Sequence, residues 1–204
     1  ISNLKFISIG GGMFSRMDNY IQKQLPFVIP SFDEYANNSV KYLVDYFNSK
    51  PDLSFTPEIL IEPGTALASK ALDFAVQVVS VKNINNELYI NTSGSKYNMN
   101  PSPNRINSPI VVYNSNSDNV IHVKKAKLSG YTCIESDIIH DDFSGDIANG
   151  DTIIFKEVGA YSVVMKPPFI LPDVAIIQFN KNTNCYDLIR CKQTFNDVFH
   201  NFKF

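Results

Sequence analysis

The chain has 204 residues, of which 44% are hydrophobic and 12% aromatic, so it has the composition of a folded globular protein with one large domain or one and a half. Its formal net charge of −2 and its pI of about 5.9 give no basic excess, which argues against nucleic acid as a partner. No apolar run approaches the roughly 20 residues that a membrane helix needs, and no stretch has the pattern of a signal peptide.

The first predicted element is a strand over residues 4–9, where apolar side chains dominate. Three glycines follow it at once: Gly10, Gly11 and Gly12. Because no Cβ atom shields their backbone N–H groups, such a loop can wrap an anion, typically a phosphate. A flexible exit loop is the alternative interpretation.

A helix is predicted over residues 32–49. Ser31 and Glu34 have the spacing of a capping box, and apolar residues at helical spacing follow them up to Pro51. Residues 13–30 contain two prolines that exclude a long helix, so this stretch is predicted to be irregular.

The next predicted strand covers residues 58–62. Its continuous apolar run is typical of a strand that is covered on both faces. A helical crossover between two strands predicts that the strands are parallel. Glu62 then stands at the carboxyl end of the strand, where α/β sheets and barrels place their chemistry, and Pro63 and Gly64 make a sharp turn. A plain exit through a Pro-Gly turn is the alternative.

After Gly64 the pattern changes. Residues 66–71 fit either a helical turn or an extended lead-in, and short strands then recur between polar turns. The predicted strands cover residues 74–79, 87–91, 109–113, 119–127, 151–156, 173–179 and 185–191. With no convincing helix between them, this part is predicted to be an antiparallel β domain.

A short closing helix is predicted over residues 193–201. Its aromatic and aliphatic side chains are expected to point inward: Phe195, Val198, Phe199 and Phe202. The domain boundary is placed near residues 65–72.

Two sites in the β domain attract attention. Cys133 and Asp137 follow Gly130 and can form an acid pair; taken alone, the residues favour the alternative of a half-buried thiol beside a solvated carboxylate. In the second site, two small residues precede Tyr161, which would let its phenol project into a tight space; a core tyrosine is the alternative.

The His140-Asp141-Asp142 run invites a metal interpretation. Adjacent residues in a loop do not converge on one ion, so we interpret the run as solvated surface. His122 and His200 are expected to be structural. The sequence contains no nucleophile elbow, Walker loop or Rossmann fingerprint.

Taken in chain order, these motifs resemble the C-terminal half of the fold-type III pyridoxal-phosphate decarboxylases, the group of ornithine, diaminopimelate and arginine decarboxylases. The matching features span residues 4–200 and are Ile9-Gly-Gly-Gly12, Glu62-Pro-Gly64, Gly130-x-x-Cys133-x-x-x-Asp137, Gly150-Asp151, Gly159-Ala-Tyr161 and the helical tail near Thr194. The resemblance implies the C-terminal part of a (β/α)8 barrel over residues 1–68. An antiparallel β-sandwich or β-barrel domain over residues 69–204 would follow it.

The resemblance also implies roles for single residues. Gly10, Gly11, Gly12, Gly64 and Tyr161 would hold the phosphate of pyridoxal 5'-phosphate. Glu62 would pair with the pyridine nitrogen, so that the ring accepts electrons as CO2 leaves. Cys133, supplied by the partner subunit of a homodimer with shared active sites, would donate a proton. Asp137 and Ile134 would contact an amino-acid-type substrate.

Several positions depart from the family pattern. The Schiff-base lysine of the family lies upstream of all residues shown here, and the chain starts at Ile1, so we expect an N-terminal barrel half to complete the enzyme. Thr65 replaces an arginine, Ile134 and Asn114 replace acids, and an aromatic-Asn pair becomes Phe169-Ile170. These departures favour a modified or conjugated amino acid over ornithine or diaminopimelate as substrate.

Two other interpretations remain open at this level. A racemase-like or degenerate, non-catalytic protein of the same fold would also explain the departures, and a generic ligand-binding module would need no family at all. Three cysteines without a C-x-x-C pair predict neither disulfides nor a zinc site, so a cytoplasmic location is expected.

Overall fold

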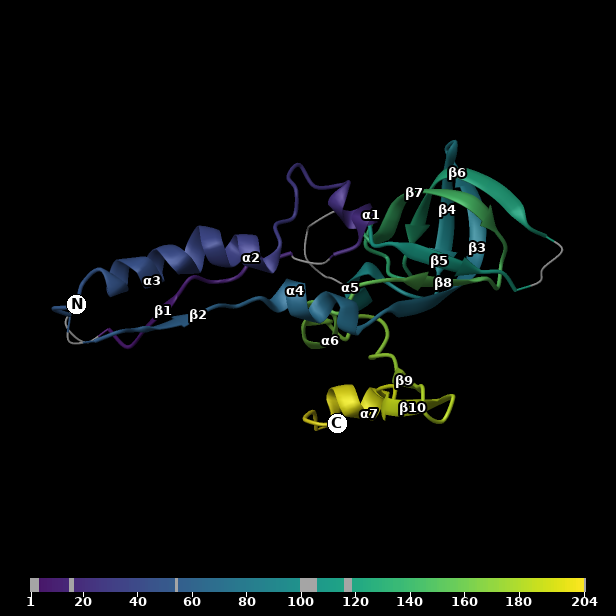
Figure 1. Cartoon of the computed structure of the whole chain (residues 1–204). Coiled ribbons are helices and arrows are strands. Elements are labelled where there is room, and N and C mark those ends of the chain that lie inside the picture. The colour runs from purple at the N-terminus through teal and green to yellow at the C-terminus, as the bar shows by residue number, and fades with distance from the viewer. Residues whose placement is uncertain (1–3, 15–16, 54, 100–105, 116–118, 204) are drawn as a thin grey trace.

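The computed structural model describes residues 4–14, 17–53, 55–99, 106–115 and 119–203. Its centre is a six-stranded sheet that curls until it is nearly closed (Figure 1). The strand order is β5-β8-β3-β4-β6-β7. The strands are β3 (Phe74–Ile84), β4 (Glu87–Thr92), β5 (Ile110–Tyr113), β6 (Ile121–Ser129), β7 (Ile138–Ile147) and β8 (Thr152–Phe155).

The long strand β3 turns the sheet over on itself. Its first four residues pair with β8, and the rest pairs with β4. The two parts are separated by a register shift between Val78 and Ser80, and a bulge of this kind bends a strand and increases its twist. The hydrophobic core lies inside the curl, where Phe155, Ile153 and Ile90 are fully buried. Each such side chain contributes about 1.5–3 kcal/mol through the apolar area that it removes from water.

The sheet is mixed, so the prediction of a purely antiparallel β domain is wrong. Strands β4 and β6 run parallel, and the other pairs of this sheet are antiparallel. The parallel pair results from the order in which the strands follow one another along the chain. After β4 the chain first forms β5, which pairs with β8, and only then forms β6, which pairs with the free edge of β4.

Strand β7 was not predicted, and the interpretation of His140-Asp141-Asp142 as solvated surface is wrong for His140, although Asp142 is exposed as expected. His140 is only 3% exposed. The pairing of β7 with β6 is interrupted by three register shifts, and Asp142 has a φ of +67°. These irregularities break the two-residue alternation that identifies a strand in a sequence.

The N-terminal part contains the predicted strand–helix–strand unit. Its strands pair in parallel as predicted, and the capping box of Ser31 and Glu34 is present. The predicted helix is interrupted by one π-helical stretch. The elements are β1 (Phe6–Ser8), α2 (Phe32–Tyr35), the π-helix Ala36–Val40, α3 (Lys41–Asn48) and β2 (Glu58–Leu60).

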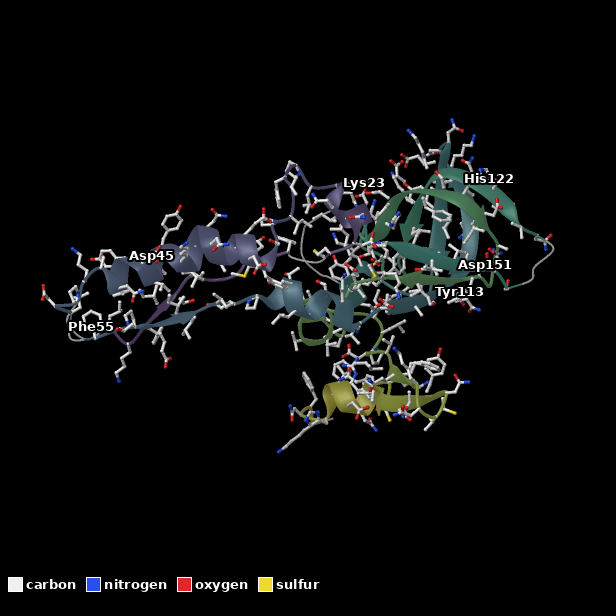
Figure 2. All side chains as sticks on the ribbon, viewed as in Figure 1. Lys23, Asp45, Phe55, Tyr113, His122 and Asp151 are labelled. Atoms are coloured by element: carbon white, nitrogen blue, oxygen red, sulfur yellow. The ribbon has the colours of Figure 1, made fainter. Side chains whose placement is uncertain are left out.

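This unit extends away from the sheet domain, and Asp45 and Phe55 mark its far end in Figure 2. Leu60 and Ile61 are 41% and 47% exposed. The expectation of a strand covered on both faces is therefore wrong here, because a two-stranded sheet leaves these side chains uncovered. The barrel portion and the domain boundary stay predictions.

The helices of the middle of the chain are short. Residues 66–71 are helical, which decides between the two alternatives for that stretch. The four-residue helices over residues 19–22, 96–99 and 162–165 were not predicted, because a helix of this length is too short to show a helical period, and the prediction that residues 13–30 are irregular is wrong for the first of them. The short elements are α1 (Asn19–Gln22), α4 (Gly64–Ala68), the 3-10 turn Ser69–Ala71, α5 (Lys96–Met99) and α6 (Ser162–Met165).

The C-terminal part is a hairpin followed by a helix, as predicted. It comprises β9 (Ile176–Asn180), β10 (Cys185–Arg190) and α7 (Phe195–Phe199). Phe195 and Phe202 are 61% and 63% exposed, so the expectation that they point inward is wrong. None of the helices in the described part of the chain combines the length and the apolar character that a membrane span requires.

Candidate functional site

The glycine loop lies against the carboxyl end of β2. The N–H of Glu62 donates to the carbonyl of Gly10 at 2.9 Å, and a Cβ atom on Gly11 would lie 2.5 Å from the carbonyl oxygen of Glu62. Gly10 and Gly12 have φ angles of +73° and +82°, which favour glycine. A Cβ atom on Gly10, Gly12 or Gly64 would meet nothing within 4 Å, so the loop is closed toward β2 and open on its other side.

The Glu62 side chain is held by a neighbouring strand. Its carboxylate accepts a hydrogen bond of 2.9 Å from the Ser8 hydroxyl, whose oxygen in turn accepts from the N–H of Gly10. The residue is exposed. A carboxylate in this position can pair with a cationic group that approaches the end of the strand.

The Gly159–Tyr161 segment packs on the turn that follows α4. The N–H of Gly159 donates to the carbonyl of Ser69 at 2.9 Å, and a Cβ atom on Gly159 would lie 2.1 Å from the carbonyl oxygen of Ala68. Tyr161 follows with a φ of +61° and is 52% exposed. The alternative of a core tyrosine is therefore wrong.

Parts of these segments meet at a cavity of about 970 Å³. Its lining includes Gly12, Thr65, Ala160 and Tyr161, together with Lys96, Lys127, Ile134, Glu135 and Asp141. Of the predicted site residues, Gly12, Ile134 and Tyr161 line this cavity, whereas Gly10, Gly11, Glu62, Gly64, Cys133 and Asp137 do not.

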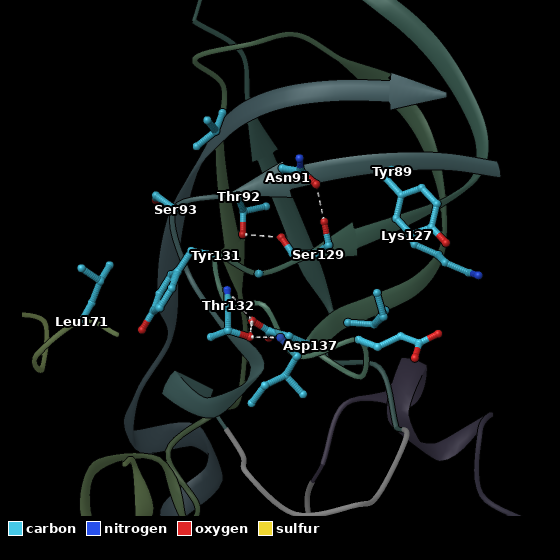
Figure 3. Close-up of a pocket in the computed structure, with 15 residues that line it drawn as sticks. Tyr89, Asn91, Thr92, Ser93, Lys127, Ser129, Tyr131, Thr132, Asp137 and Leu171 are labelled. Atoms are coloured by element: carbon cyan, nitrogen blue, oxygen red, sulfur yellow. Dashed lines mark hydrogen bonds between the residues drawn. The ribbon is translucent and has the colours of Figure 1, made fainter. Parts of the chain in front are cut away.

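Asp137 holds the turn that carries Cys133. It is 2% exposed and accepts hydrogen bonds from the hydroxyl of Ser95 and the N–H of Lys96. It also accepts hydrogen bonds from the hydroxyl and the N–H of Thr132 (Figure 3). A Cβ atom on Gly130 would lie 2.1 Å from this carboxylate. Asp137 is therefore not a solvated acid, and its carboxylate orders the turn. Its role in substrate binding stays a prediction.

Cys133 is exposed, so it is not the half-buried thiol of the alternative interpretation. The neighbouring Ile134 and Glu135 belong both to the first cavity and to a second hollow of about 760 Å³. Hydroxyl and amide groups dominate the polar lining of this hollow, which includes Asn91, Thr92, Ser93, Ser129, Tyr131 and Thr132 (Figure 3).

Asn114 occupies a position where the family resemblance implies an acid that contacts the substrate. In this structure its side chain has a structural role. Its amide donates to Asp151 at 2.9 Å. Asp151 is fully buried, which raises its pKa, but hydrogen bonds from Ser115, Ala148 and Asn114 outweigh that effect and leave the pKa below its usual value. Asn114 thus fastens the end of β5 to the turn before β8.

Sequence reasoning missed several residues of the cavity wall. Lys96, Lys127, Glu135 and Glu157 stand in no pattern that would single them out, although Lys127 lies only three residues before Gly130. Within the described ranges, no three His, Cys, Asp or Glu side chains are grouped so that they would hold a metal ion.

Comparison with known proteins matches residues 41–159 to the family model described as "Pyridoxal-dependent decarboxylase, C-terminal sheet domain". Among curated protein sequences, none matches this chain.

Several solved structures share the fold. A diaminopimelate decarboxylase structure has a TM-score of 0.76 at 19% identity, over 98% of this chain and 48% of that one. The Helicobacter pylori diaminopimelate decarboxylase, complexed with L-lysine, has a TM-score of 0.70 at 20% identity, over 98% and 45% of the two chains. The arginine decarboxylase of Paramecium bursaria Chlorella virus, bound to agmatine, has a TM-score of 0.59 at 22% identity, over 81% and 41%. The chain spans less than half the length of each.

Proposed function

This chain belongs to the pyridoxal-dependent decarboxylases through their C-terminal sheet domain, and from that premise we propose that it forms the C-terminal portion of a pyridoxal-phosphate-dependent amino-acid decarboxylase. The resemblance inferred from the sequence motifs is thereby confirmed at the level of the family. We propose two partners for this portion. The first is an upstream barrel half that carries the cofactor-binding lysine, and the second is another copy of the protein. A cytoplasmic location completes the proposal.

One observation carries the proposal. Gly12 of the glycine loop, Thr65 next to Gly64, and Ala160 and Tyr161 line the same cavity, although they are spread over about 150 residues of sequence. Gly10, Gly12 and Gly64 are open toward solvent, so their backbone can be approached closely by a ligand. This arrangement fits the phosphate of pyridoxal 5'-phosphate, since unshielded N–H groups bind anions.

When bound, the cofactor supplies a protonated pyridine ring that accepts electrons as the carboxylate carbon leaves as CO2. In our proposal, Glu62 keeps the ring nitrogen protonated through a charge-assisted hydrogen bond. The glycine N–H groups and the Tyr161 hydroxyl orient the phosphate. Cys133 of the partner subunit holds the proton that replaces CO2.

We further propose that the substrate is a modified or conjugated amino acid. Ile134 presents an apolar side chain where the family has an acid, which disfavours a substrate with a distal amine. The second hollow adjoins the cavity at Ile134 and Glu135 and offers mostly neutral polar groups, which supports a larger polar substrate.

The first test is a visible absorption spectrum of the complete protein that contains this chain, before and after treatment with borohydride. We expect a yellow chromophore that becomes covalently fixed on reduction. A protein that stays colourless with added pyridoxal 5'-phosphate would contradict the proposal and favour a degenerate, non-catalytic scaffold.

Glu62→Gln is expected to lower turnover about 10- to 100-fold, because removal of a charge-assisted hydrogen bond is worth about 1.5–3 kcal/mol. Stability should change little, since the side chain is exposed and is bonded to a single surface hydroxyl in this structure. The matched control is Glu58→Gln at the other end of β2, which makes the same change in charge. Equal turnover in the two variants would remove Glu62 from the site.

Cys133→Ala is expected to change the stereochemistry of the product, or the share of side reactions, as much as the rate. The thiol is exposed and is available to a partner subunit. The measurement is decarboxylation in deuterated water, with NMR analysis of the labelled product. A variant with wild-type rate and product would exclude Cys133 from proton transfer.

A further inference from the structure

Glu157 stands just before the Gly159–Tyr161 segment and has an unusual backbone. Its φ is +58°, a left-handed conformation that costs free energy in a residue other than glycine. Its side chain is only 12% exposed and lines the cavity of about 970 Å³. A strained residue with a mostly buried charge needs contacts that offset both costs.

The carboxylate joins two other segments of the cavity wall. One oxygen lies 3.4 Å from the ammonium group of Lys70, in the 3-10 turn that continues α4. The other accepts a hydrogen bond of 3.1 Å from the N–H of Asp18, the N-cap of α1. One side chain therefore connects the segments that follow the glycine loop and Gly64 with the segment that leads to Tyr161.

The backbone of Glu157 is fastened as well. Its N–H donates to Asp73 at 3.1 Å, and Asp73 also pairs with Lys156. The pairing with Lys70 matters for an anion site, because an unpaired carboxylate on the cavity wall would repel a phosphate. The ion pair with Lys70 offsets part of that repulsion, so that Glu157 can connect the two segments.

We propose that Glu157 is a positioning residue that ties the three phosphate-binding segments together, so that the cofactor's phosphate is gripped by a rigid cradle. This inference rests on the proposed function. Glu157 acts through Lys70 and through the N–H of Asp18, and it does so without any contact of its own with the phosphate.

Other contacts of α1 limit the effect that we expect from the loss of the Glu157 carboxylate. Helix α1 is also anchored by a pair of hydrogen bonds between Gln24 and Asn107, of 2.8 and 2.9 Å, and by the contact of Tyr20 with His140. Loss of the Glu157 link should therefore loosen the cradle without detaching α1 from the sheet domain.

The experiment measures the dissociation constants of pyridoxal 5'-phosphate and of pyridoxal, which lacks the phosphate, with the complete protein freed of its cofactor. Glu157→Ala is expected to weaken binding of pyridoxal 5'-phosphate about tenfold and to leave that of pyridoxal within about twofold. Glu157→Gln keeps one acceptor oxygen and is expected to fall between wild type and Glu157→Ala.

Asp18 provides a matched pair of variants. Asp18→Ala loses the capping side chain but keeps the N–H, whereas Asp18→Pro loses both, and the φ of −60° at this position suits proline. The proposal predicts that Asp18→Pro weakens binding of pyridoxal 5'-phosphate more than Asp18→Ala does, and that the difference between these two variants is no larger than the loss in Glu157→Ala.

A second readout needs no cofactor. Lys23 ends α1 beside the sheet domain (Figure 2), so a looser α1 should speed trypsin cleavage after Lys23 several-fold in Glu157→Ala. Equal losses of affinity for both compounds, or an unchanged cleavage rate, would overturn the positioning role. A wild-type protein that binds neither compound would overturn the proposed function instead, and the cleavage rates would still decide whether Glu157 holds α1.

Discussion

Replacement of Asp137 by alanine is expected to lower the free energy of unfolding of the sheet domain by about 3–5 kcal/mol. The reason is the number of buried or half-buried donors that lose their acceptor, because each buried donor left unsatisfied costs about 1–3 kcal/mol. The donors are the hydroxyl of Ser95, which is fully buried, the N–H of Lys96, and the hydroxyl and N–H of Thr132. The measurement is urea unfolding followed by circular dichroism, since the chain has no tryptophan.

The matched control is Asp146→Ala. Asp137 directly precedes β7 and Asp146 lies near the end of it, but the Asp146 side chain is 67% exposed and pairs with His122, so its loss should cost less than about 1 kcal/mol. Asp137→Asn, which keeps one acceptor oxygen, is expected to lie between the two. An Asp137→Ala variant with wild-type stability and no turnover would contradict the structural role of Asp137. It would support the prediction that Asp137 binds the substrate.

The sequence predicted the elements that obey a simple period. The strand–helix–strand unit with its Ser31 cap and the strands around Val76 and Ile153 follow from local patterns. Strand β7 escaped prediction because its buried apolar residues, Ile139, Phe143 and Ile147, recur every four residues. Asp141 and Gly145 occupy the positions between them, so the stretch lacks the apolar residue at every second position that identifies a strand.

The candidate site was only partly accessible from the sequence. Gly11 and Glu62 could be identified because a glycine run and a carboxylate at a strand end are local patterns with a chemical meaning. The link from Glu157 to Asp18 spans 139 residues, and the contact of Tyr20 with His140 spans 120. Such contacts depend on how the chain folds over the sheet, which no local pattern encodes.

His140 makes the stability of this region depend on pH. The ring is 3% exposed, lies parallel to the Tyr20 ring with 6.2 Å between centroids, and is 3.3 Å from the Tyr20 hydroxyl. Burial lowers the pKa of His140 from 6.5 to about 4, against smaller opposing effects of Asp141 and Asp142. Since the folded protein holds the neutral ring, protonation favours the unfolded state.

The sign of the pH effect follows from the two pKa values. Above pH 6.5 the ring is neutral in both states and the stability is complete. Between pH 6.5 and about 4 the unfolded state binds more protons, so the free energy of unfolding falls as the pH is lowered. A difference of about 2.5 between the pKa values is worth about 3 kcal/mol, and most of it should be lost by pH 4.

We therefore expect the free energy of unfolding to fall steadily between pH 7 and pH 4.5, and His140→Phe to flatten this slope, because phenylalanine keeps the aromatic contact with Tyr20 and does not titrate. His122→Gln, at an exposed histidine on β6, should keep the wild-type slope. Urea unfolding at several pH values gives the comparison. A His140→Phe slope equal to that of wild type would show that the ring is not held neutral. It would also show that the Tyr20 contact, which anchors α1 beside the cavity, does not weaken in acid.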